Sequence, residues 1–449
     1  MGVDGRALRA AARAILDAAI ASGDARRLTR EALAASRGPL TIGDRAIDLA
    51  RVRRVLVVGA GKASGAMAEA AEEVLGDRVA DGLVAVKEVQ GASTRRVRVV
   101  EAGHPLPDAR GEAAAAEILG IATEAGADDL VLCLVSGGGS ALLPLPVPGL
   151  ALEDKQRVTR LLLEAGATIN ELNAVRKHLS RLKGGQLARA AVPAPVVALL
   201  LSDVIGDPLD VIASGPTAPD PTTFGDALAV LDGFDLRSRV PAAARSYLEA
   251  GARGERSETP KPGDPVFDRV SNVIIGNNDL VVAAAAEEAR RRGYAPVVLT
   301  RSLQGEAREV ARVFVAVLEE VARSGRPVGR PACVIAAGET TVTVRGGGKG
   351  GRCQEFCLAL AARVASVPDV LVLGAGTDGT DGPTEAAGAL VDWTTLARGR
   401  ALGLDARAFL ADNDAYAFFA ALGDLVTTGP TGTNLMDLYV GLVGGSPGP

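Results

Sequence analysis

The chain has 449 residues, of which 48% are hydrophobic and 23% are charged. Its 49 basic and 54 acidic side chains give a formal net charge of −5, which excludes the broad basic excess typical of nucleic-acid-binding proteins. The apolar fraction is that of a globular protein and excludes a largely disordered chain. The length exceeds what one hydrophobic core supports, so we expect two α/β domains.

The apolar stretches favour a protein without membrane spans. Long runs such as 195–201 have the length of a strand and fall far short of the ~20 residues that cross a bilayer. Residues 1–21 predict an amphipathic helix rather than a cleavable leader. The four cysteines lack metal-ligand spacing, so a reduced, cytoplasmic location is expected. We expect small-molecule substrates as partners, with no nucleic acid and no membrane, and leave open whether the protein is a homodimer.

In the first half, short β-branched runs alternate with helical patterns, which predicts βαβ units and a parallel sheet. Strands are expected at 55–58, 83–86, 97–100, 130–135 and 196–201. A helix is expected over 63–75, and a longer one carries Leu172, Val175, Leu179 and Leu182 on one face. We therefore predict a Rossmann-like three-layer domain over residues 1–255.

The second half follows a polar segment that contains three prolines, and 256–270 is the expected linker. The second α/β domain is expected over 271–449, with a mixed sheet. Its predicted strands are 273–275, 296–299, 333–337, 341–344 and 370–373. The pair around Gly338 is expected to form a hairpin.

The first loop that could carry chemistry is Gly59-Ala60-Gly61-Lys62-Ala63-Ser64, directly after the first strand. Glycines at a strand-to-helix turn let backbone N–H groups approach an anion, so Gly61 and Ser64 are expected to bind phosphate. Lys62 suits a charge directed at a phosphoryl group. The alternative is an ordinary turn with an exposed lysine.

The second loop is Ser136-Gly137-Gly138-Gly139-Ser140, which follows another strand. Its unblocked N–H groups and two hydroxyls predict a phosphate-binding nest, and a flexible loop is the alternative. Ser140 as a nucleophile is not favoured, since the G-x-S-x-G pattern and a histidine partner are missing.

Acids follow the strand at 196–201. Asp203 and Asp207 are expected at the carboxyl end of that strand, where ligands bind in open α/β sheets. They could hold Mg²⁺, which needs few protein carboxylates, or one could accept a proton from a hydroxyl. Simple capping roles are the alternative.

Two further loops lie in the second half. The glycine-rich segment 345–355 contains Lys349 and leads into a helix at Arg352, where guanidinium, backbone N–H groups and helix dipole could address one anion. The loop 376–382 contains Asp378, a candidate metal or substrate ligand. Purely structural roles are the alternative for both.

These loops, in this order, resemble the MOFRL-type D-glycerate 2-kinases, a family whose members also carry the name hydroxypyruvate reductase. The matching stretches are 59–64, 103–105, 136–140, 173–178, 202–204, 276–278, 338–340, 350–355, 376–379 and 431–434. The resemblance implies an α/β N-terminal domain, a C-terminal MOFRL domain, and ATP- and Mg²⁺-dependent phosphorylation of D-glycerate to 2-phosphoglycerate. The family's active-site lysine, arginine and aspartate fall on Lys62, Arg352 and Asp378.

We therefore expect a glycerate 2-kinase, a phosphotransferase that uses an alcohol acceptor. Phosphoryl transfer needs positioning and charge neutralisation, so Lys62 and Arg352 are expected to supply positive charge, and Asp378 and Asp203 to complete the catalytic set. The expected metal ligands are Asp203 and Asp207. Arg176, Lys349 and Asn434 join the glycine loops as substrate- or phosphate-binding residues. Because the motifs come from both halves, the active site is expected in the cleft between the domains.

Two other functions stay open at this point. An NAD(P)H-dependent hydroxypyruvate reductase would use the first glycine turn, but its G-x-G-x-x-x-G spacing and Lys62 do not suit a dinucleotide. A non-catalytic sugar-phosphate- or nucleotide-binding protein would explain the phosphate loops but not the acids that accompany them.

Overall fold

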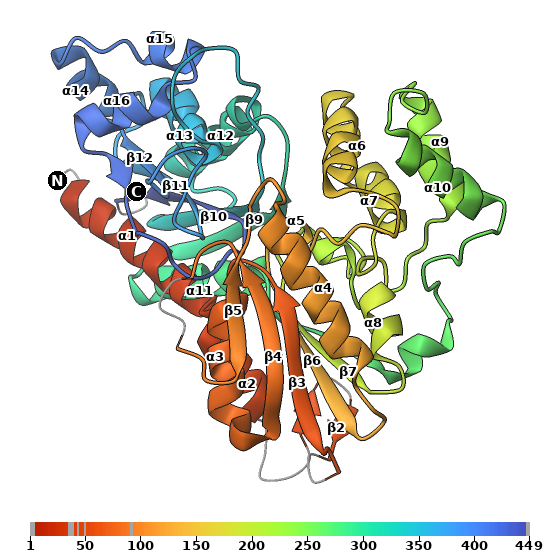
Figure 1. Ribbon diagram of the computed structural model, residues 1–449. Coiled ribbons are helices and arrows are strands. Elements are labelled where there is room, and N and C mark those ends of the chain that lie inside the picture. The colour runs from red at the N-terminus through yellow and green to blue at the C-terminus, as the bar shows by residue number, and fades with distance from the viewer. Residues whose placement is uncertain (1–4, 35–39, 43–44, 49–50, 90–92, 446–449) are drawn as a thin grey trace. The chain divides into compact units, whose positions relative to one another are not determined.

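The computed structural model describes residues 5–34, 40–42, 45–48, 51–89 and 93–445 (Figure 1). The chain divides into two compact units. We call Ala25–Ile275 the N-unit, and Met1–Asp24 together with Gly276–Pro449 the C-unit. No helix within the described ranges is long and apolar enough to cross a membrane.

The N-unit is built on a six-stranded sheet of order β5-β4-β3-β6-β7-β8. Its strands are β3 (Arg54–Ala60), β4 (Val79–Val86), β5 (Val97–Glu101), β6 (Asp129–Val135), β7 (Val196–Leu201) and β8 (Val270–Gly276). The pairs β3–β4, β4–β5, β3–β6 and β6–β7 are all parallel. The strands predicted in the first half are confirmed. The continuous apolar runs of β3, β6 and β7 are buried on both faces, as in a covered parallel sheet.

Helices cover this sheet on both faces. The chain runs from β3 through α3 (Ser64–Leu75) to β4 in one direction along the sheet, and from β5 through α4 (Ala109–Thr123) to β6 in the other. Right-handed crossovers therefore place α3 and α4 on opposite faces, and Figure 1 shows α4 across the face turned to the viewer. The direction reverses between β3 and β6, so their carboxyl ends border the crevice where open α/β sheets bind ligands.

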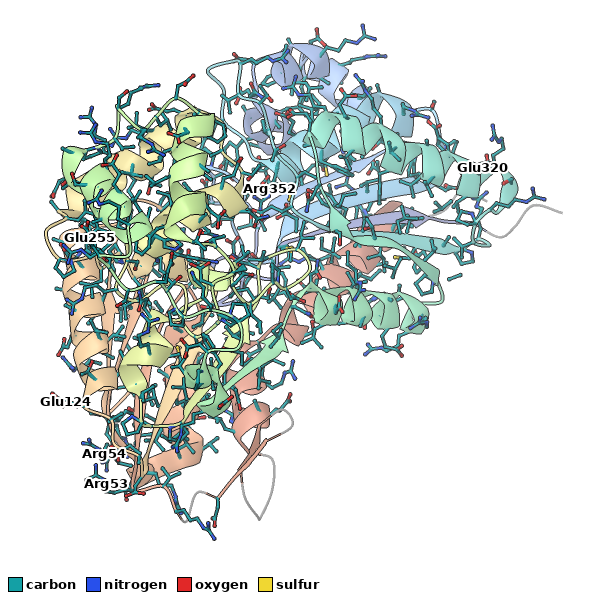
Figure 2. The ribbon with its side chains drawn as sticks, turned by 90° about the vertical axis from the view of Figure 1, so that its right-hand side faces the viewer. Arg53, Arg54, Glu124, Glu255, Glu320 and Arg352 are labelled. Atoms are coloured by element: carbon teal, nitrogen blue, oxygen red, sulfur yellow. The ribbon has the colours of Figure 1, made fainter. Side chains whose placement is uncertain are left out.

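Ion pairs connect β3 and β6 at their amino-terminal ends, opposite the crevice. Arg53 and Arg54, labelled in Figure 2, both reach the buried carboxylate of Asp129. The N–O distances are 3.0 Å from Arg53 Nη2 and 3.2 Å from Arg54 Nε. Arg54 and Asp129 are also register partners, so these ion pairs support the alignment of β3 with β6.

The rest of the N-unit is mostly helical. Its helices are α2 (Ala25–Ala34), α5 (Gly139–Leu142), α6 (Leu152–Glu164), α7 (Ile169–His178), α8 (Gln186–Ala191), α9 (Phe224–Gly233) and α10 (Ala242–Ala252). A two-stranded sheet is formed by β1 (Leu40–Ile42) and β2 (Arg45–Ile47), and short 3₁₀ segments lie at Gly76–Arg78, Ile212–Ser214 and Pro265–Arg269.

The predicted helix face over 172–182 is too long. Helix α7 ends at His178, and Leu179 and Leu182 lie beyond it, although both are buried. The Ser180 side chain accepts the backbone N–H groups of Leu182 and Lys183, each at 3.3 Å. A serine that bonds nearby backbone offers an alternative to the helix and turns the chain here.

The expected linker 256–270 is folded into the N-unit rather than lying between domains. Glu258 accepts hydrogen bonds from the His178 ring at 3.0 Å and from the backbone of Phe224 at 2.8 Å. Thr259 donates to the buried carboxylate of Asp220. The predicted strand 273–275 also belongs to the first sheet, as β8. The prolines and charged residues of this segment are typical of a linker. In the structure, however, its polar side chains Glu258 and Thr259 form hydrogen bonds with groups of the folded N-unit.

The C-unit has a mixed sheet of order β13-β12-β11-β14-β10-β9. Its strands are β9 (Ala295–Leu303), β10 (Ala332–Gly338), β11 (Val370–Gly376), β12 (Gly388–Asp392), β13 (Leu425–Val426) and β14 (Asp437–Val443). Among the described residues of this sheet, β9 and β10 pair in parallel and the other pairs are antiparallel. The mixed sheet is confirmed.

The predicted hairpin around Gly338 is wrong. The segment 341–344 is not a strand, and only Thr341 forms an isolated bridge, with Glu306. Strand β10 already pairs with β9 on one edge and β14 on the other, so no edge is left for a hairpin partner.

Helices complete the C-unit. They are α1 (Gly5–Ser22), α11 (Asn278–Arg291), α12 (Ala307–Ser324), α13 (Arg352–Val364), α14 (Thr395–Ala401), α15 (Ala406–Ala411) and α16 (Ala415–Leu422). The predicted N-terminal helix is confirmed from Gly5, and residues 1–4 lie outside the described residues. Arg9 on this helix pairs with Asp392 at 2.6 Å and Asp424 at 2.7 Å. Helix α1 was expected in the first domain, but its apolar face is buried in the C-unit.

Candidate functional site

The turn after β3 is shaped by its second glycine. Gly61 has φ +148°, and a Cβ there would lie 2.1 Å from Ser136 Oγ and 2.5 Å from the Ser136 carbonyl oxygen. Only glycine lets the two loops approach so closely. The loops after β3 and β6 therefore meet at the crevice that the strand order predicts.

Two buried serines join these loops. The Ser136 Oγ accepts the backbone N–H of Ala63 at 2.9 Å, and Ser64 donates to the Leu134 carbonyl at 3.1 Å. The two hydroxyl oxygens are 3.3 Å apart. Both side chains were expected to bind phosphate, but in this structure their hydroxyls bond to protein groups and hold the loops together.

Lys62 lies beside the second glycine loop. Its backbone N–H donates to the Gly137 carbonyl at 2.9 Å. A Cβ on Gly138 would lie 3.6 Å from Lys62 Cγ and 2.9 Å from the His104 ring. Gly138 has φ +83°, which also favours glycine. The structure thus brings Lys62, Gly138 and His104 together at the carboxyl ends of the strands.

A pocket of about 470 Å³ opens next to this group, within the N-unit. It is lined by the loop containing His104, by Gly138 and Ser140, and by side chains of α6 and α7. Four cationic residues line it as well: the exposed Arg160, and Lys155, Arg176 and Lys183. Of these, only Arg176 was predicted as a site residue.

Lys155, Arg176 and Lys183 have few hydrogen-bond partners among the described residues. Lys183 Nζ donates to the carbonyl oxygens of Ser140 at 2.7 Å and Leu143 at 3.0 Å, and Arg176 Nη2 reaches Ser140 at 3.4 Å. Lys155 Nζ and Arg176 Nε are buried and have no hydrogen-bond partner among the described residues. Burial lowers the pKa of Arg176 to about 10. Burial, together with the charge of Arg176, holds the pKa of Lys155 well below its ordinary value.

Ser140 belongs to a short chain of hydrogen bonds. Its hydroxyl is 2.7 Å from that of Ser214, which donates to Asn173 Oδ1 at 2.9 Å. Ser214 and its neighbour Ala213 both have positive φ, +62° and +49°. Consecutive non-glycine residues in the left-handed region are strained, and such strain is often found at functional sites.

Asp203 and Asp207 lie in the loop after β7, as predicted, and both are half-buried. Asp207 is in the left-handed region, with φ +54°. The described residues contain no group of three or more His, Cys, Asp or Glu side chains that could hold a metal ion. A site here would therefore have few protein ligands.

In the C-unit, Arg352 begins α13 as predicted and is labelled in Figure 2. Its guanidinium is paired with two acids. Nε lies 2.5 Å and Nη2 3.0 Å from the two oxygens of Asp437, and Nη1 lies 2.6 Å from Glu339. Asp437 was not predicted as a site residue, although an acid at the start of the apolar run 438–443 is an unusual signal.

The N-terminus of α13 is already occupied. Asp381 accepts the backbone N–H groups of Cys353 at 3.1 Å and Gln354 at 2.9 Å. A Cβ on Gly351 would lie 2.2 Å from the Asp381 carboxyl carbon. The helix end was expected to face an external anion, but a buried carboxylate of the chain takes that place. Burial, and then the charge of Asp437, raises the pKa of Asp381 to about 7.

Asp378 lies in the loop that follows β11. Its Oδ1 accepts the backbone N–H and the hydroxyl of Thr380, both at 3.0 Å. Burial raises the pKa of Asp437, with smaller contributions from the charges of Glu339 and Asp378. Asp378 is thus part of the electrostatic surroundings of Arg352 and Asp437.

The two remaining predicted residues lie elsewhere on the C-unit loops. Lys349 Nζ is 3.5 Å from Glu385 and 4.7 Å from the centre of the Tyr416 ring. Asn434 is half-buried in the loop before β14.

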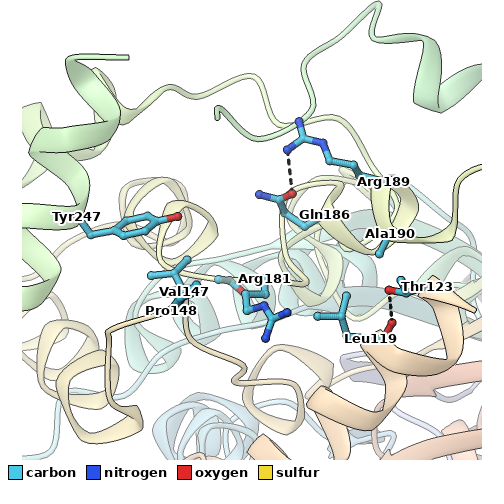
Figure 3. A pocket seen from close by; sticks show the side chains of 10 residues that line it. Leu119, Thr123, Val147, Pro148, Arg181, Gln186, Arg189, Ala190 and Tyr247 are labelled. Atoms are coloured by element: carbon cyan, nitrogen blue, oxygen red, sulfur yellow. Dashed lines mark hydrogen bonds between the residues drawn. The ribbon is translucent and has the colours of Figure 1, made fainter. Parts of the chain in front are cut away.

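A second pocket of the N-unit, of about 270 Å³, is drawn in Figure 3. Two of its polar side chains bond each other, since Arg189 donates to Gln186 at 3.0 Å. Thr123 donates to the Leu119 carbonyl at 2.7 Å. Of the described residues that line it, none is a predicted site residue, so we assign it no function.

Comparison with known proteins bears on both units. Residues 11–249 match a domain of unknown function (DUF4147), and residues 332–437 match the MOFRL family. The chain is 42% identical over 391 residues to the glycerate 2-kinase of Pyrococcus horikoshii, covering 87% of each. It is 43% identical over 396 residues to the D-glycerate 2-kinase of Thermotoga maritima, covering 87% of this chain and 91% of that one. The chain belongs to the MOFRL-type glycerate kinase family.

A solved structure of this glycerate kinase family agrees with the fold. The crystal structure of glycerate kinase from Thermotoga maritima matches with a TM-score of 0.85 and 39% identity, covering 98% of this chain and 100% of that one. The resemblance and the α/β fold expected from the sequence are confirmed. The role of each site residue, and the expected location of the active site between the domains, stay predictions.

Proposed function

We propose that this protein transfers the γ-phosphoryl group of ATP to the 2-hydroxyl of D-glycerate, giving 2-phospho-D-glycerate and ADP. The observation that carries the proposal is the 43% identity to D-glycerate 2-kinase over 87% of the chain. The cations and acids that such a reaction needs are present on the loops described above.

Positive charge comes from two residues in this proposal. Phosphoryl transfer requires neutralisation of the charge on the transferring group, with little covalent chemistry by the protein. Lys62 would address the phosphoryl group from the crevice of the parallel sheet. Arg352 would bind an anion through Nη1, whose present partner Glu339 has a side chain 48% exposed and can be displaced. Asp437 would keep the guanidinium in place.

An acid must accept the proton that leaves the 2-hydroxyl. Asp203 and Asp378 are the candidates, because both are half-buried carboxylates on loops at strand ends. The oxygen of the 2-hydroxyl forms the new bond to phosphorus, the bond from phosphorus to the bridging oxygen of ADP breaks, and the proton passes to the carboxylate.

The carboxylate oxygens of Asp203 and Asp207 are suitable ligands for a bound Mg²⁺. This ion commonly takes one or two protein carboxylates and completes its shell with water and phosphate oxygens. When bound, it would supply charge neutralisation on the nucleotide phosphates. The backbone of Gly137 to Gly139, the Ser140 hydroxyl and Arg176 would contact phosphate from the protein side, and Lys349 and Asn434 would bind substrate from the C-unit.

The reductase alternative is not supported by the first glycine turn. A dinucleotide needs open backbone donors at the start of the following helix. Here the Ala63 N–H, which precedes α3, donates to Ser136, and the Ser64 N–H bonds to the Gly61 carbonyl at 3.2 Å. A non-catalytic binding protein is not supported either, since several relatives that cover most of the chain are named as kinases.

Incubation with D-glycerate, ATP and Mg²⁺, followed by phosphorus NMR, tests the reaction. We expect ADP and 2-phosphoglycerate. Formation of 3-phosphoglycerate alone would contradict the regiochemistry. Oxidation of NADH by hydroxypyruvate without ATP would overturn the kinase assignment.

A cytoplasmic location is proposed on the state of the cysteines. Cys133, Cys333, Cys353 and Cys357 are all buried free thiols, which a reducing compartment maintains. Whether the protein forms a homodimer stays open to measurement by sedimentation.

A further inference from the structure

The buried Lys155 and Lys183 and the half-buried Arg176 converge on the 470 Å³ pocket from separate segments of the N-unit, and the exposed Arg160 lines it as well. Lys155 comes from α6, Arg176 from α7, and Lys183 from the turn that precedes α8. None of the described residues that line the pocket is acidic. Burying several like charges without a counterion is unfavourable, so the pocket is built for an anion that the protein itself does not supply.

Two unpaired nitrogen atoms indicate what kind of anion the pocket binds. Lys155 Nζ and Arg176 Nε are buried without a hydrogen-bond partner among the described residues. The charge of Glu112 favours the protonated form of Lys155 and raises its pKa, but this effect is smaller than the opposing effect of Arg176. A polyanion with several oxygens would pair these groups, whereas a single carboxylate would leave some of them unpaired.

Apolar side chains also line the pocket. Leu106 and Leu163, which line it from the loop after β5 and from α6, are 71% and 59% exposed. Pro105 and Leu172 line it as well. Large exposed leucines at the mouth of a pocket favour a ligand with a flat apolar part. Glycerate has three carbons, each with an oxygen, and offers no such part.

The pocket also adjoins the predicted reaction centre. Gly138 and His104 line it, and the Lys62 side chain lies beside Gly138. A ligand in the pocket could therefore extend an anionic end toward Lys62 without leaving the N-unit.

We propose that this pocket binds the nucleoside triphosphate, with its base against Leu106 and Leu163 and its phosphates on Lys155, Arg176 and Lys183. The terminal phosphate then lies toward Lys62. This assignment rests on the proposed function and adds to it the location of the phosphoryl donor.

Calorimetric binding of ADP to the full-length protein tests the assignment with Lys155→Met and Arg157→Met. Arg157 lies on the same helix but is exposed and does not line the pocket, so its variant controls for lost charge. We expect Lys155→Met to weaken ADP binding about tenfold or more, and Arg157→Met to leave it nearly unchanged. The melting temperature of Lys155→Met should stay level or rise, because an unpaired buried charge is removed.

Leu163→Ser separates the base from the phosphates. It should weaken ADP binding severalfold and leave binding of inorganic tripolyphosphate unchanged. Equal ADP affinity in the wild type and Lys155→Met would overturn the proposal. A raised KM for glycerate with an unchanged KM for ATP would also overturn it and assign the pocket to the acceptor. If ADP binding responds as expected but D-glycerate is not phosphorylated, the proposed function fails and the nucleotide pocket stands.

Discussion

Arg352 and Asp437 form a two-pronged ion pair in the C-unit, with N–O distances of 2.5 Å and 3.0 Å. The Asp437 side chain is 1% exposed, while that of Arg352 is 33% exposed. The aspartate is therefore the fixed partner, and the arginine presents its remaining nitrogen at the surface. Two parallel hydrogen bonds hold a guanidinium in one plane, which a single contact would not.

Asp437→Asn should release Arg352 from this orientation. Removing one partner of a buried pair costs about 3–5 kcal/mol of unfolding free energy. We also expect kcat/KM to fall by about 10–100-fold, as when a group that orients a ligand is lost. Urea denaturation and steady-state kinetics measure both effects. Glu339→Gln is the control, because an exposed ion pair contributes at most about 1 kcal/mol. A fully active and stable Asp437→Asn protein would show that the pair does not position Arg352.

Lys62→Met should remove positive charge from the transferring phosphoryl group. The loss of about 3–5 kcal/mol of transition-state stabilisation lowers kcat/KM roughly 10²–10³-fold or more. The melting temperature should change little, because Lys62 is only half-buried. Kinetics with ATP and D-glycerate, together with a thermal scan, check both expectations. Turnover near the wild-type rate would leave Lys62 as an ordinary residue of the turn.

Arg352→Lys separates binding of the acceptor from stabilisation of the transition state. Lysine is a point charge and cannot reproduce the planar fork that bonds Asp437 and a substrate anion together. If Arg352 binds the glycerate carboxylate, the main effect is a raised KM for glycerate. If it contacts the moving phosphoryl group, kcat falls and KM stays nearly constant. If Arg352→Lys keeps the wild-type kcat and the wild-type KM for glycerate, both roles of Arg352 are excluded.

Asp381 should make stability depend on pH near neutrality. Its pKa is raised to about 7 by burial, from an ordinary value of 3.8. The folded state therefore holds a proton that the unfolded state has released between these two values. The stabilisation is complete below about pH 4 and is lost as pH rises through 7, a difference of about 2–3 kcal/mol between pH 5 and pH 8.

Urea denaturation of the wild type and Asp381→Asn at several pH values between 5 and 8 measures this slope. The variant cannot titrate at this position, so the difference between the two proteins should change with pH. A constant difference would contradict the raised pKa.

The N-unit sheet could be predicted because its signals are local. Strands β3, β6 and β7 are continuous apolar runs, and the loops at their carboxyl ends contain the glycines of tight turns. The start of α13 at Arg352 was equally visible, since a glycine-rich stretch ends there. Such patterns depend on residues a few positions apart.

Pairings between distant residues could not be predicted from those patterns. Arg352 and Asp437 are 85 positions apart, and Asp381 caps α13 from the loop after β11. Arg352 was expected to bind an external anion, because nothing nearby in the chain shows that a buried carboxylate already holds it.

The sequence by itself determined the parallel sheet, its glycine turns and the types of charged residue near them, because periodicity and backbone freedom are properties of short segments. Only the tertiary structure decided which charges are paired. Asp437 neutralises Arg352, while Lys155 and Arg176 keep buried atoms without partners among the described residues. Burial and pairing depend on every segment packed around a side chain, and that surrounding exists only after the chain has folded.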